Sequence, residues 1–429
     1  MQIDSILIYE SPTVTSLYPF TILHCGWELR LGANLYYEKI QKFFPDAKLM
    51  FQGREKHLES FYTRYNPKRN EFKKENILVL NTAIYPSIDF FDSLDKFYNE
   101  HLKQDLISKS ALFVHNGKPI AVYMAAEDVI NPSDKDLDFL PKIISEFSRL
   151  IPQIEIPEPK LINFLWDAFD DVGKDINDSK DYYTCHVDEG KLKIAGVHLV
   201  NPDNIRICDS ARIAPGVVID ASEGAVIIDR NARIMANAVL EGPCYIGENS
   251  TVKIGAKIYG NTAIGKHCKI GGEIENSIIQ GYSNKQHEGF LGHSFISEWV
   301  NLGADTNTSD LKNTYSNISV NFYKQEIDTG RMFLGLLCGD HTKSAINTSF
   351  TTGTVAGICG IVVADGFLPN YIPSFAWRGV KNCTFYKPDK AIETARIVMK
   401  RRGKELTEIE ETLIRDEFTN AKSIFYNLL

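Results

Sequence analysis

The sequence has no apolar run long enough to cross a membrane, and no signal-like pattern opens it. Its eight cysteines form no CxxC pair. They predict buried, reduced thiols and argue against a disulfide framework or a zinc site. Basic residues are also few, because 47 Lys and Arg face 55 Asp and Glu, for a net charge of −8. This balance argues against nucleic acid or a membrane as partner and, with the missing signal, predicts a cytoplasmic protein.

What the sequence does contain is an aliphatic residue at every sixth position through its middle. One slip of three residues interrupts this ladder, at Glu223 and Gly224. A six-residue apolar period fits a parallel β-helix, in which each short face sends one side chain into a triangular core. The ladder consists of Ile207, Ile213, Ile219, Ile228, Ile234, Leu240, Ile246, Val252, Ile258, Ile264 and Ile270.

The ladder breaks near Asn276, and the polar, glycine-rich segment 277–289 follows. We expect this segment to be a loop that leaves the coil, because loops displayed by a rigid scaffold usually carry chemistry. The ladder is expected to resume at Phe290, Ile296 and Leu302, with a weaker return at Ile346, Thr352 and Ile358.

The remainder of the chain predicts two further parts around the coil. Residues 1–155 alternate strand and helix patterns, which indicates an α/β domain with a mostly parallel sheet. Residues 156–190 predict a stiff linker and a helix, residues 191–385 the β-helix, and residues 386–429 two C-terminal helices. At 429 residues with 44% hydrophobic content, the chain is long enough for several cores.

Two segments of the coil, 283–292 and 300–304, resemble the acetyltransferase half of the bifunctional glucosamine-1-phosphate acetyltransferase/N-acetylglucosamine-1-phosphate uridylyltransferases. The repeat itself resembles the left-handed hexapeptide coils, most of which are trimeric acyltransferases. The whole chain, including Tyr-Pro-Phe-Thr at 18–21 and Glu-Leu-Arg-Leu-Gly at 28–32, resembles bacterial sugar nucleotidyltransferases of the Bacteroidetes type fused to such coils.

The resemblance implies roles for several residues of the coil. His287 would be the general base, and Glu273 would orient its imidazole. A polar loop histidine that hydrogen-bonds a neighbouring coil is the alternative interpretation of His287. Asn301 would hold the sugar, Phe290 stands where the family usually has a substrate-contacting tyrosine, and the Ala304 backbone would lie beside the acetyl group of acetyl-CoA.

Asn284 and Lys285, in the same motif, are expected to contact the substrate. The chain departs from the family at Asp310, where an asparagine is usual, and at Glu275, where a lysine is usual. An acidic Glu275 weakens phosphate binding and places glucosamine 1-phosphate itself in doubt.

Other histidines offer alternatives. His341, next to Asp340 in a polar segment, is a second candidate base, and a structural corner histidine is its alternative interpretation. Asp340 is also a candidate contact for the acetyl-CoA cosubstrate. His293 and His267 raise a metal site, but their spacing differs from that of the zinc-binding coils, so no metal site is predicted.

The N-terminal domain has the arrangement of a nucleotidyltransferase but not all of its chemistry. Residues 10–18 contain no glycine to close on phosphates, and Asn81 stands where a magnesium-binding aspartate is expected. Arg30 could still clamp a phosphate, and Glu28 or Asp89 could recruit Mg²⁺ with a nucleoside triphosphate, although a surface ion pair or cap explains them equally well.

Together these patterns predict a homotrimeric transferase that acetylates an amino-sugar phosphate or nucleotide sugar from acetyl-CoA. One alternative is an active uridylyl- or thymidylyltransferase whose coil only forms the trimer. Another is a non-catalytic sensor of nucleotide sugars.

Overall fold

The structure, a computed structural model, describes residues 1–71, 73–102, 109–128, 151–183, 190, 192, 196–322, 325–363, 368–378 and 383–426. Within these ranges no helix combines the length and apolar character needed to span a membrane. Six cysteines in the same ranges are buried free thiols, as predicted, namely Cys25, Cys208, Cys244, Cys268, Cys338 and Cys359. Cys185 and the side chain of Cys383 lie outside the described part.

The chain divides into two compact units. The N-terminal unit comprises residues 1–17, 24–29 and 35–163, and the solenoid unit comprises 18–23, 30–34 and 164–429. Two short pieces of the N-terminal sequence thus belong to the solenoid unit. This division puts Arg30 in one unit and Glu28 in the other, although only one residue separates them.

The N-terminal unit confirms the predicted α/β architecture with a six-stranded sheet of order β4-β1-β5-β7-β6-β8. The strands are β1 (Ser5–Tyr9), β4 (Lys48–Gln52), β5 (Ile77–Asn81), β6 (Ala111–His115), β7 (Lys118–Met124) and β8 (Gln153–Glu155). Its helices are α1 (Tyr36–Phe43), α2 (Glu55–Tyr65) and α3 (Ile88–Leu102). The central strands β1 and β5 are parallel and almost fully buried, as their continuous apolar runs require.

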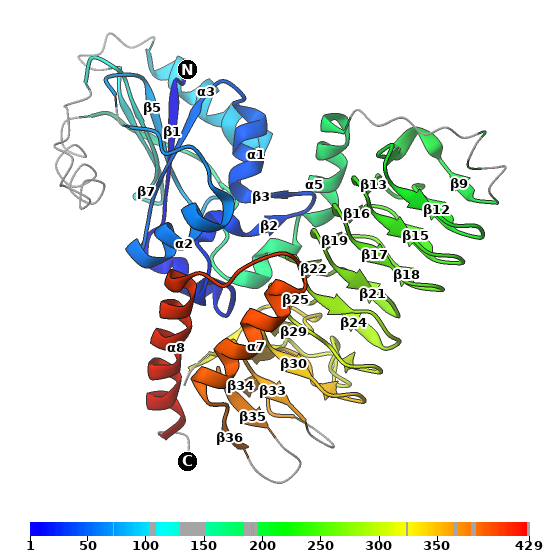
Figure 1. Cartoon of the computed structure of the whole chain (residues 1–429). Helices are drawn as coiled ribbons and strands as arrows, with labels where there is room; N and C mark the ends of the chain where they lie inside the picture. Colours follow the sequence, from blue (N-terminus) through cyan, green and yellow to red (C-terminus); the bar gives the residue numbers. More distant parts are fainter. Residues whose placement is uncertain are drawn as a thin grey trace. The chain divides into compact units, whose positions relative to one another are not determined.

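The solenoid unit is a parallel β-solenoid with three faces, visible as the stack of short arrows from β9 to β35 in Figure 1. Face 1 contains β10 (Ile205–Ile207), β13 (Val226–Ile228), β16 (Cys244–Ile246), β19 (Thr262–Ile264), β22 (Ile278–Ile279), β25 (Phe295–Ile296), β29 (Leu336–Cys338), β32 (Thr354–Ala356) and β34 (Tyr371–Ile372). The parallel β-helix is therefore confirmed; its left-handed sense stays a prediction.

The other two faces are shorter. Face 2 contains β11 (Arg212–Ile213), β14 (Arg233–Ile234), β17 (Thr251–Val252), β20 (Lys269–Ile270), β23 (Asn284–Lys285), β30 (Lys343–Ser344), β33 (Ile361–Val362) and β35 (Ala376–Arg378), and bridges through Asn301 join β23 to β30. Face 3 contains β9 (His198–Val200), β12 (Val218–Asp220), β15 (Val239–Glu241), β18 (Lys257–Ile258), β21 (Glu273–Glu275) and β24 (Phe290–Gly292).

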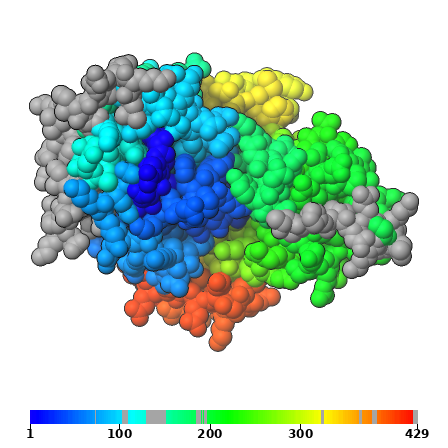
Figure 2. All heavy atoms as spheres, turned by 90° about the horizontal axis from the view of Figure 1, so that it is seen from above, coloured from blue at the N-terminus to red at the C-terminus, as the bar shows by residue number. Residues whose placement is uncertain are grey.

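Smaller elements complete the described chain. They are the strands β2 (Arg30–Leu31), β3 (Asn34–Leu35), β26 (Asn307–Thr308), β27 (Ser319–Phe322), β28 (Gln325–Asp328), β31 (Ser349–Phe350) and β36 (Cys383–Phe385), the helix α5 (Val172–Ser179), and 3-10 turns at Pro12–Leu17, Phe20–Ile22, Gly26–Glu28, Leu165–Phe169, Lys180–Tyr182 and Pro202–Asn204. β27 and β28 form an antiparallel hairpin within an insertion, residues 310–335, between two coils. Part of the insertion lies at the surface, in yellow in Figure 2.

The predicted aliphatic ladder fills the solenoid core. Its members from Ile219 to Ile270 are at most 1% exposed. The predicted slip is also present. Ile207 pairs with Ile228, and Ile228 pairs with Ile246; the first of these two steps along the chain is three residues longer than the second.

The expected loop at 277–289 is wrong. The segment contains β22 and β23, and Ile270 pairs directly with Lys285. The coil is merely shortened here, so the six-residue count fails while the stacking continues. Phe290 consequently lies outward, and Leu291, with no exposed surface, takes the inward place.

The expected return of the ladder near its end was also partly wrong. Ile346 is 67% exposed, whereas Phe350 is buried in the solenoid core. Ile358 is buried as expected, but it packs in a separate cluster with residues of the C-terminal helices.

The corner between faces 1 and 2 repeats one backbone conformation. Each coil from β13 onward places one residue there at a φ between 53° and 62°, namely Asn231, Asn249, His267, Tyr282, Trp299, His341, Cys359 and Phe375. Four of these rings stack, with centroids 4.9 Å apart for His267 and Tyr282, 4.4 Å for Tyr282 and Trp299, and 6.2 Å for Trp299 and His341.

The two C-terminal helices, α7 (Pro388–Lys400) and α8 (Glu408–Tyr426), are confirmed. Thr407 and Glu410 form the predicted capping box, since the Thr407 N–H donates to the Glu410 carboxylate at 2.9 Å. Met399 at the end of α7 packs against Tyr282 and Trp299, so the helix pair covers the stacked corner.

Candidate functional site

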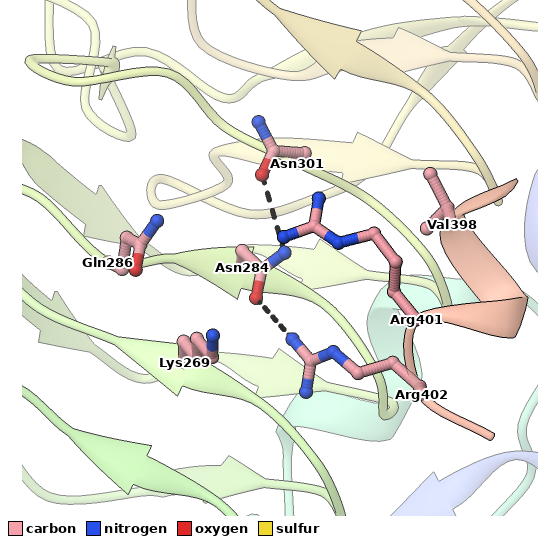
Figure 3. Close-up of a pocket in the computed structure, with 7 residues that line it drawn as sticks. All are labelled: Lys269, Asn284, Gln286, Asn301, Val398, Arg401 and Arg402. Atoms are coloured by element: carbon pink, nitrogen blue, oxygen red, sulfur yellow. Dashed lines mark hydrogen bonds between the residues drawn. The ribbon is translucent and has the colours of Figure 1, made fainter. Parts of the chain in front are cut away.

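A cavity of about 270 Å³ lies between face 2 of the solenoid and the end of α7. Figure 3 shows its lining residues, which are Lys269, Asn284, Gln286, Asn301, Val398, Arg401 and Arg402. Both walls belong to the solenoid unit. We call it the face-2 pocket.

The strand register produces one wall of this pocket. Lys269 pairs with Asn284, and Asn284 with Asn301, so the three side chains lie above one another on consecutive coils. They point outward because side chains alternate along a strand and the following residues Ile270, Lys285 and Leu302 are buried.

Arg402 ties the helical wall to the solenoid. Its guanidinium donates to the Asn284 side-chain oxygen at 2.8 Å and to the His267 carbonyl at 2.7 Å. The Asn284 amide in turn donates to the Asn301 side-chain oxygen at 3.3 Å, as the dashed lines of Figure 3 show. The amides are therefore held in place by a charged partner.

The electrostatics of the pocket favour an anion. Lys269, Arg401 and Arg402 supply three positive charges, and none of the seven lining residues is acidic. Burial, followed by repulsion from Arg402 and Arg401, lowers the pKa of Lys269. A bound anion would relieve this repulsion, and guanidinium groups with amides form a donor set suited to phosphate oxygens.

The pocket brings together two of the predicted site residues, Asn284 and Asn301, but not Lys285. Lys285 is 2% exposed, and its ammonium donates to the carbonyls of His287 at 2.8 Å and Glu288 at 3.1 Å. Burial lowers the pKa of Lys285 to about 8. Its place in the core holds the backbone of the following corner, which does not support a substrate contact.

The predicted base lies at that corner, between faces 2 and 3. His287 is exposed, and Glu273 begins β21 on face 3, where it pairs with Phe290. In the described part of the chain no hydrogen bond joins the His287 imidazole to Glu273. The Ala304 carbonyl accepts the Asn347 N–H at 2.8 Å. The roles of these four residues stay predictions.

His341 and Asp340 lie at the corner between faces 1 and 2. They are 4% and 1% exposed, and the Asp340 carboxylate accepts the Glu298 N–H at 3.1 Å. The His341 ring belongs to the stacked corner over Trp299. This burial favours the structural interpretation over a base or an acetyl-CoA contact.

The suggested metal pair, His267 and His293, is not brought together. His267 belongs to the stacked corner, whereas His293 follows β24 at the corner between faces 3 and 1.

The N-terminal candidates are similarly engaged. Glu28 is fully buried and pairs with Arg64 at 2.7 Å and with His24 at 3.2 Å. Burial opposes its ionisation, but Arg64 and His24 outweigh it and lower the pKa of Glu28. Cations therefore already satisfy this carboxylate, which does not support a metal ligand.

Arg30 is 5% exposed, and its guanidinium donates to the carbonyls of Gln280 at 3.2 Å and Ala33 at 3.1 Å. All three residues belong to the solenoid unit. This placement does not support a phosphate clamp in the N-terminal domain.

Sequence reasoning missed five pocket residues, Lys269, Gln286, Val398, Arg401 and Arg402. The only signal at the sequence level was the basic run that ends α7, which is also the usual composition of a helix C-terminus. Only the packing of α7 on face 2 gives this run a partner surface.

Comparisons with known proteins find similarity to nucleotidyltransferases and acetyltransferases. Residues 6–186 match the sugar nucleotidyl transferase family. The chain is 32% identical over 188 residues to the Bifunctional protein GlmU of Methanococcus aeolicus, covering 43% of this chain and 44% of the relative. It is 24% identical over 266 residues to the Bifunctional protein GlmU of Nostoc sp., covering 53% and 55%.

A third relative, the Bifunctional sugar-1-phosphate nucleotidylyltransferase/acetyltransferase of Sulfurisphaera tokodaii, is 33% identical over 137 residues, covering 32% of this chain and 34% of the relative. The chain thus spans between about a third and about half of the curated relatives it matches. Among solved structures, a mutant of the N-acyltransferase AntD from Bacillus cereus with dTDP and coenzyme A covers 51% of this chain and 100% of its own, at 15% identity and a TM-score of 0.21.

Proposed function

We propose that the chain is a transferase of sugar-nucleotide synthesis. Its solenoid unit transfers an acetyl group from acetyl-CoA to an amino-sugar phosphate or a nucleotide sugar. Its N-terminal unit is a divergent sugar-1-phosphate nucleotidyltransferase-like domain. The active form is a cytoplasmic homotrimer.

The observation that carries this proposal is the face-2 pocket. Acetyl-CoA, sugar phosphates and nucleotide sugars all carry phosphate groups, which three cationic side chains and three amides can bind. The name of the Sulfurisphaera tokodaii relative, which combines sugar-1-phosphate nucleotidyl transfer with acetyl transfer, supports the same reaction class.

Acetyl transfer to an amine needs a base, because the attacking nitrogen must lose a proton as the C–N bond forms and the C–S bond of the thioester breaks. His287, with Glu273 as its partner, is one candidate for that base on the basis of the family resemblance.

Two residues of the N-terminal unit argue against magnesium-dependent turnover. The Asn81 side-chain oxygen at the end of β5 already accepts the Ala83 N–H at 3.0 Å. The next carboxylate after β1, Glu10, is paired with Arg54 at 3.1 Å. These residues fit a magnesium ion poorly, so no catalytic step is assigned to one.

Calorimetric titration with acetyl-CoA, UDP, dTDP and amino-sugar 1-phosphates tests the pocket. Arg401→Gln and Lys269→Gln should each weaken binding of the phosphate-bearing ligand about tenfold, the usual effect of losing a charged hydrogen bond. Arg396→Gln, on an exposed part of α7, is the matched control. Equal affinities in all three variants would refute the assignment of the pocket.

Activity assays separate the alternatives. Acetylation of the sugar by acetyl-CoA would support the proposal. Release of pyrophosphate from UTP or dTTP without acetylation would favour the nucleotidyltransferase alternative, which the family match of residues 6–186 supports. Nucleotide-sugar binding with neither activity would indicate a sensor. Light scattering should give a trimer, and a monomer at micromolar concentration would contradict the proposed assembly.

A further inference from the structure

Face 3 carries acidic residues outward where face 2 carries basic ones. Glu273 and Glu275 both point away from the core, because Ile274 between them is fully buried. The insertion that follows the coil adds Asp310 near the same edge, since its carboxylate lies within bonding distance of His293.

His293 and Asp310 form a histidine–carboxylate pair that sequence reasoning did not identify. The Nδ1 atom of His293 lies 2.8 Å from the Asp310 carboxylate, and the two side chains are 22% and 14% exposed. The imidazole also stacks on Phe333 at 5.1 Å with an interplanar angle of 24°, so its orientation is fixed from two sides.

The pair lies beside a residue that the family resemblance places against the substrate. A Cβ atom built on Gly292 would come within 2.3 Å of the Asp310 carboxylate and 2.5 Å of the Phe290 ring. A larger residue at this position would therefore have to displace the Asp310 carboxylate and the Phe290 ring, which both lie close to the backbone here. The backbone N–H of His293 donates to the backbone carbonyl of Glu275 at 3.1 Å. Glu275, a second residue with a carboxylate, therefore lies at the same edge.

We propose that His293, oriented by Asp310, is the general base that activates the acceptor amine in the acetyl transfer. The assignment rests on the proposed function. With Nδ1 held by the carboxylate, Nε2 of the neutral imidazole accepts a proton from the substrate amine. The nitrogen attacks the thioester carbonyl, the C–N bond forms, the C–S bond breaks, and the departing thiolate takes the proton back from the imidazolium, which Asp310 stabilises.

The surrounding charges indicate what binds at this edge. Glu275 and Asp310 attract the ammonium form of an amino sugar and repel its phosphate, which agrees with the departure of both positions from the family pattern. His287, by comparison, is exposed, and no hydrogen bond within the described residues holds its ring against Glu273. The geometry favours His293 because an oriented base costs less reorganisation in the transition state.

Steady-state acetylation kinetics of His293→Asn test the assignment. Asparagine suits the backbone here, where φ is +43°, and it can still hydrogen-bond to Asp310, but it cannot carry a proton. We expect kcat to fall about 100- to 10,000-fold while KM for both substrates and the melting temperature stay close to wild type. His198→Asn, on exposed β9, is the control and should retain full activity.

Asp310→Asn provides a readout that a structural role would not move. Without the carboxylate nothing charged orients the imidazole, so kcat should fall, by less than in His293→Asn, while KM for both substrates stays close to wild type. Full activity of His293→Asn together with an inactive His287→Gln would overturn the inference and return the base role to His287. If the wild-type protein itself acetylated no substrate, the proposed function would be refuted. That outcome is distinct from a failure of the His293 assignment, in which the wild-type protein is active and His293→Asn is too.

Discussion

Two stretches of the solenoid share the same backbone fold but differ in the residues at equivalent positions. In the regular coils, residues 226–275, every inward position of face 2 is aliphatic, and the corners before β14 and β17 hold Asn231 and Asn249. In the altered coils, residues 277–310, face 2 turns Lys285 inward, and the corners hold Tyr282 and Trp299. The strand register of face 1 passes through both without a break.

The comparison shows that the fold of the solenoid depends on the stacking of one coil on the next and not on one residue type at each inward position. Substitutions that would be costly in a regular coil are tolerated where a local partner compensates, such as carbonyls for Lys285 or stacked rings for Trp299. The altered coils also supply Asn284 and Asn301 to the face-2 pocket, and they supply His293, which pairs with Asp310. Departures from the repeat therefore occur at both candidate sites, where they act together with Lys269 and Glu275 of the regular coils.

The largest expected effect comes from moving the buried lysine into a regular coil. Val252→Lys would place an ammonium between Ile234 and Ile270, which pack above and below it with no exposed surface. An unpaired buried charge should lower the free energy of unfolding by about 4 to 5 kcal/mol or more, measured in urea. Thr251→Lys, one residue earlier and pointing outward, is the control. If the Val252→Lys protein were as stable as wild type, the regular coils would tolerate a buried lysine as well as the altered coil does.

The converse change should stabilise the altered coil. The folded pKa of Lys285, about 8, lies below its ordinary value of 10.5, so the charged form is disfavoured by folding at neutral pH. This shift corresponds to roughly 3 kcal/mol at pH 7. Lys285→Met keeps the length of the side chain and should recover part of that free energy.

The pH dependence gives the sign of the effect. Between about pH 8 and 10.5 the unfolded chain holds a proton on Lys285 that the folded chain has released, so wild-type stability should rise with pH across this window. Lys285→Met should remove that contribution, whereas Lys257→Met, on the outer side of face 3, should not. Parallel stability curves for wild type and Lys285→Met from pH 7 to 10.5 would contradict the assignment.

The regular coils could be predicted from the sequence because one physical constraint, an inward side chain at every sixth residue, acts alone there. Residues from Ile219 to Ile270 all fall where the period places them. At Lys285 the same constraint is met by an alkyl stem with a charged end, and the residue looks polar in the sequence. The shortened coil was therefore mistaken for a loop.

The candidate site was predictable only in part. Asn284 and Asn301 belong to a motif and could be selected from the sequence, but their neighbours in the pocket could not. Arg401 and Arg402 lie a hundred residues or more away along the chain, and their place beside face 2 depends on how α7 packs over the stacked corner. Asp310 was noticed as a departure from a pattern, yet its partner His293 became apparent only through the path of the insertion.

The smallest expected effect concerns the corners, where both kinds of coil need the left-handed backbone. Asn249 has a φ of 58° and an exposed side chain, so replacing it tests the backbone preference with little change in packing. Asn249→Ala should cost about 1 kcal/mol, because alanine is disfavoured in this region, whereas Asn249→Gly should be nearly neutral. Urea unfolding at pH 7 measures both variants. If alanine were as well tolerated as glycine, the left-handed corner would not constrain the sequence, and the replacement of asparagine by Trp299 in the altered coil, at a φ of 62°, would need no compensation from its stacked neighbours.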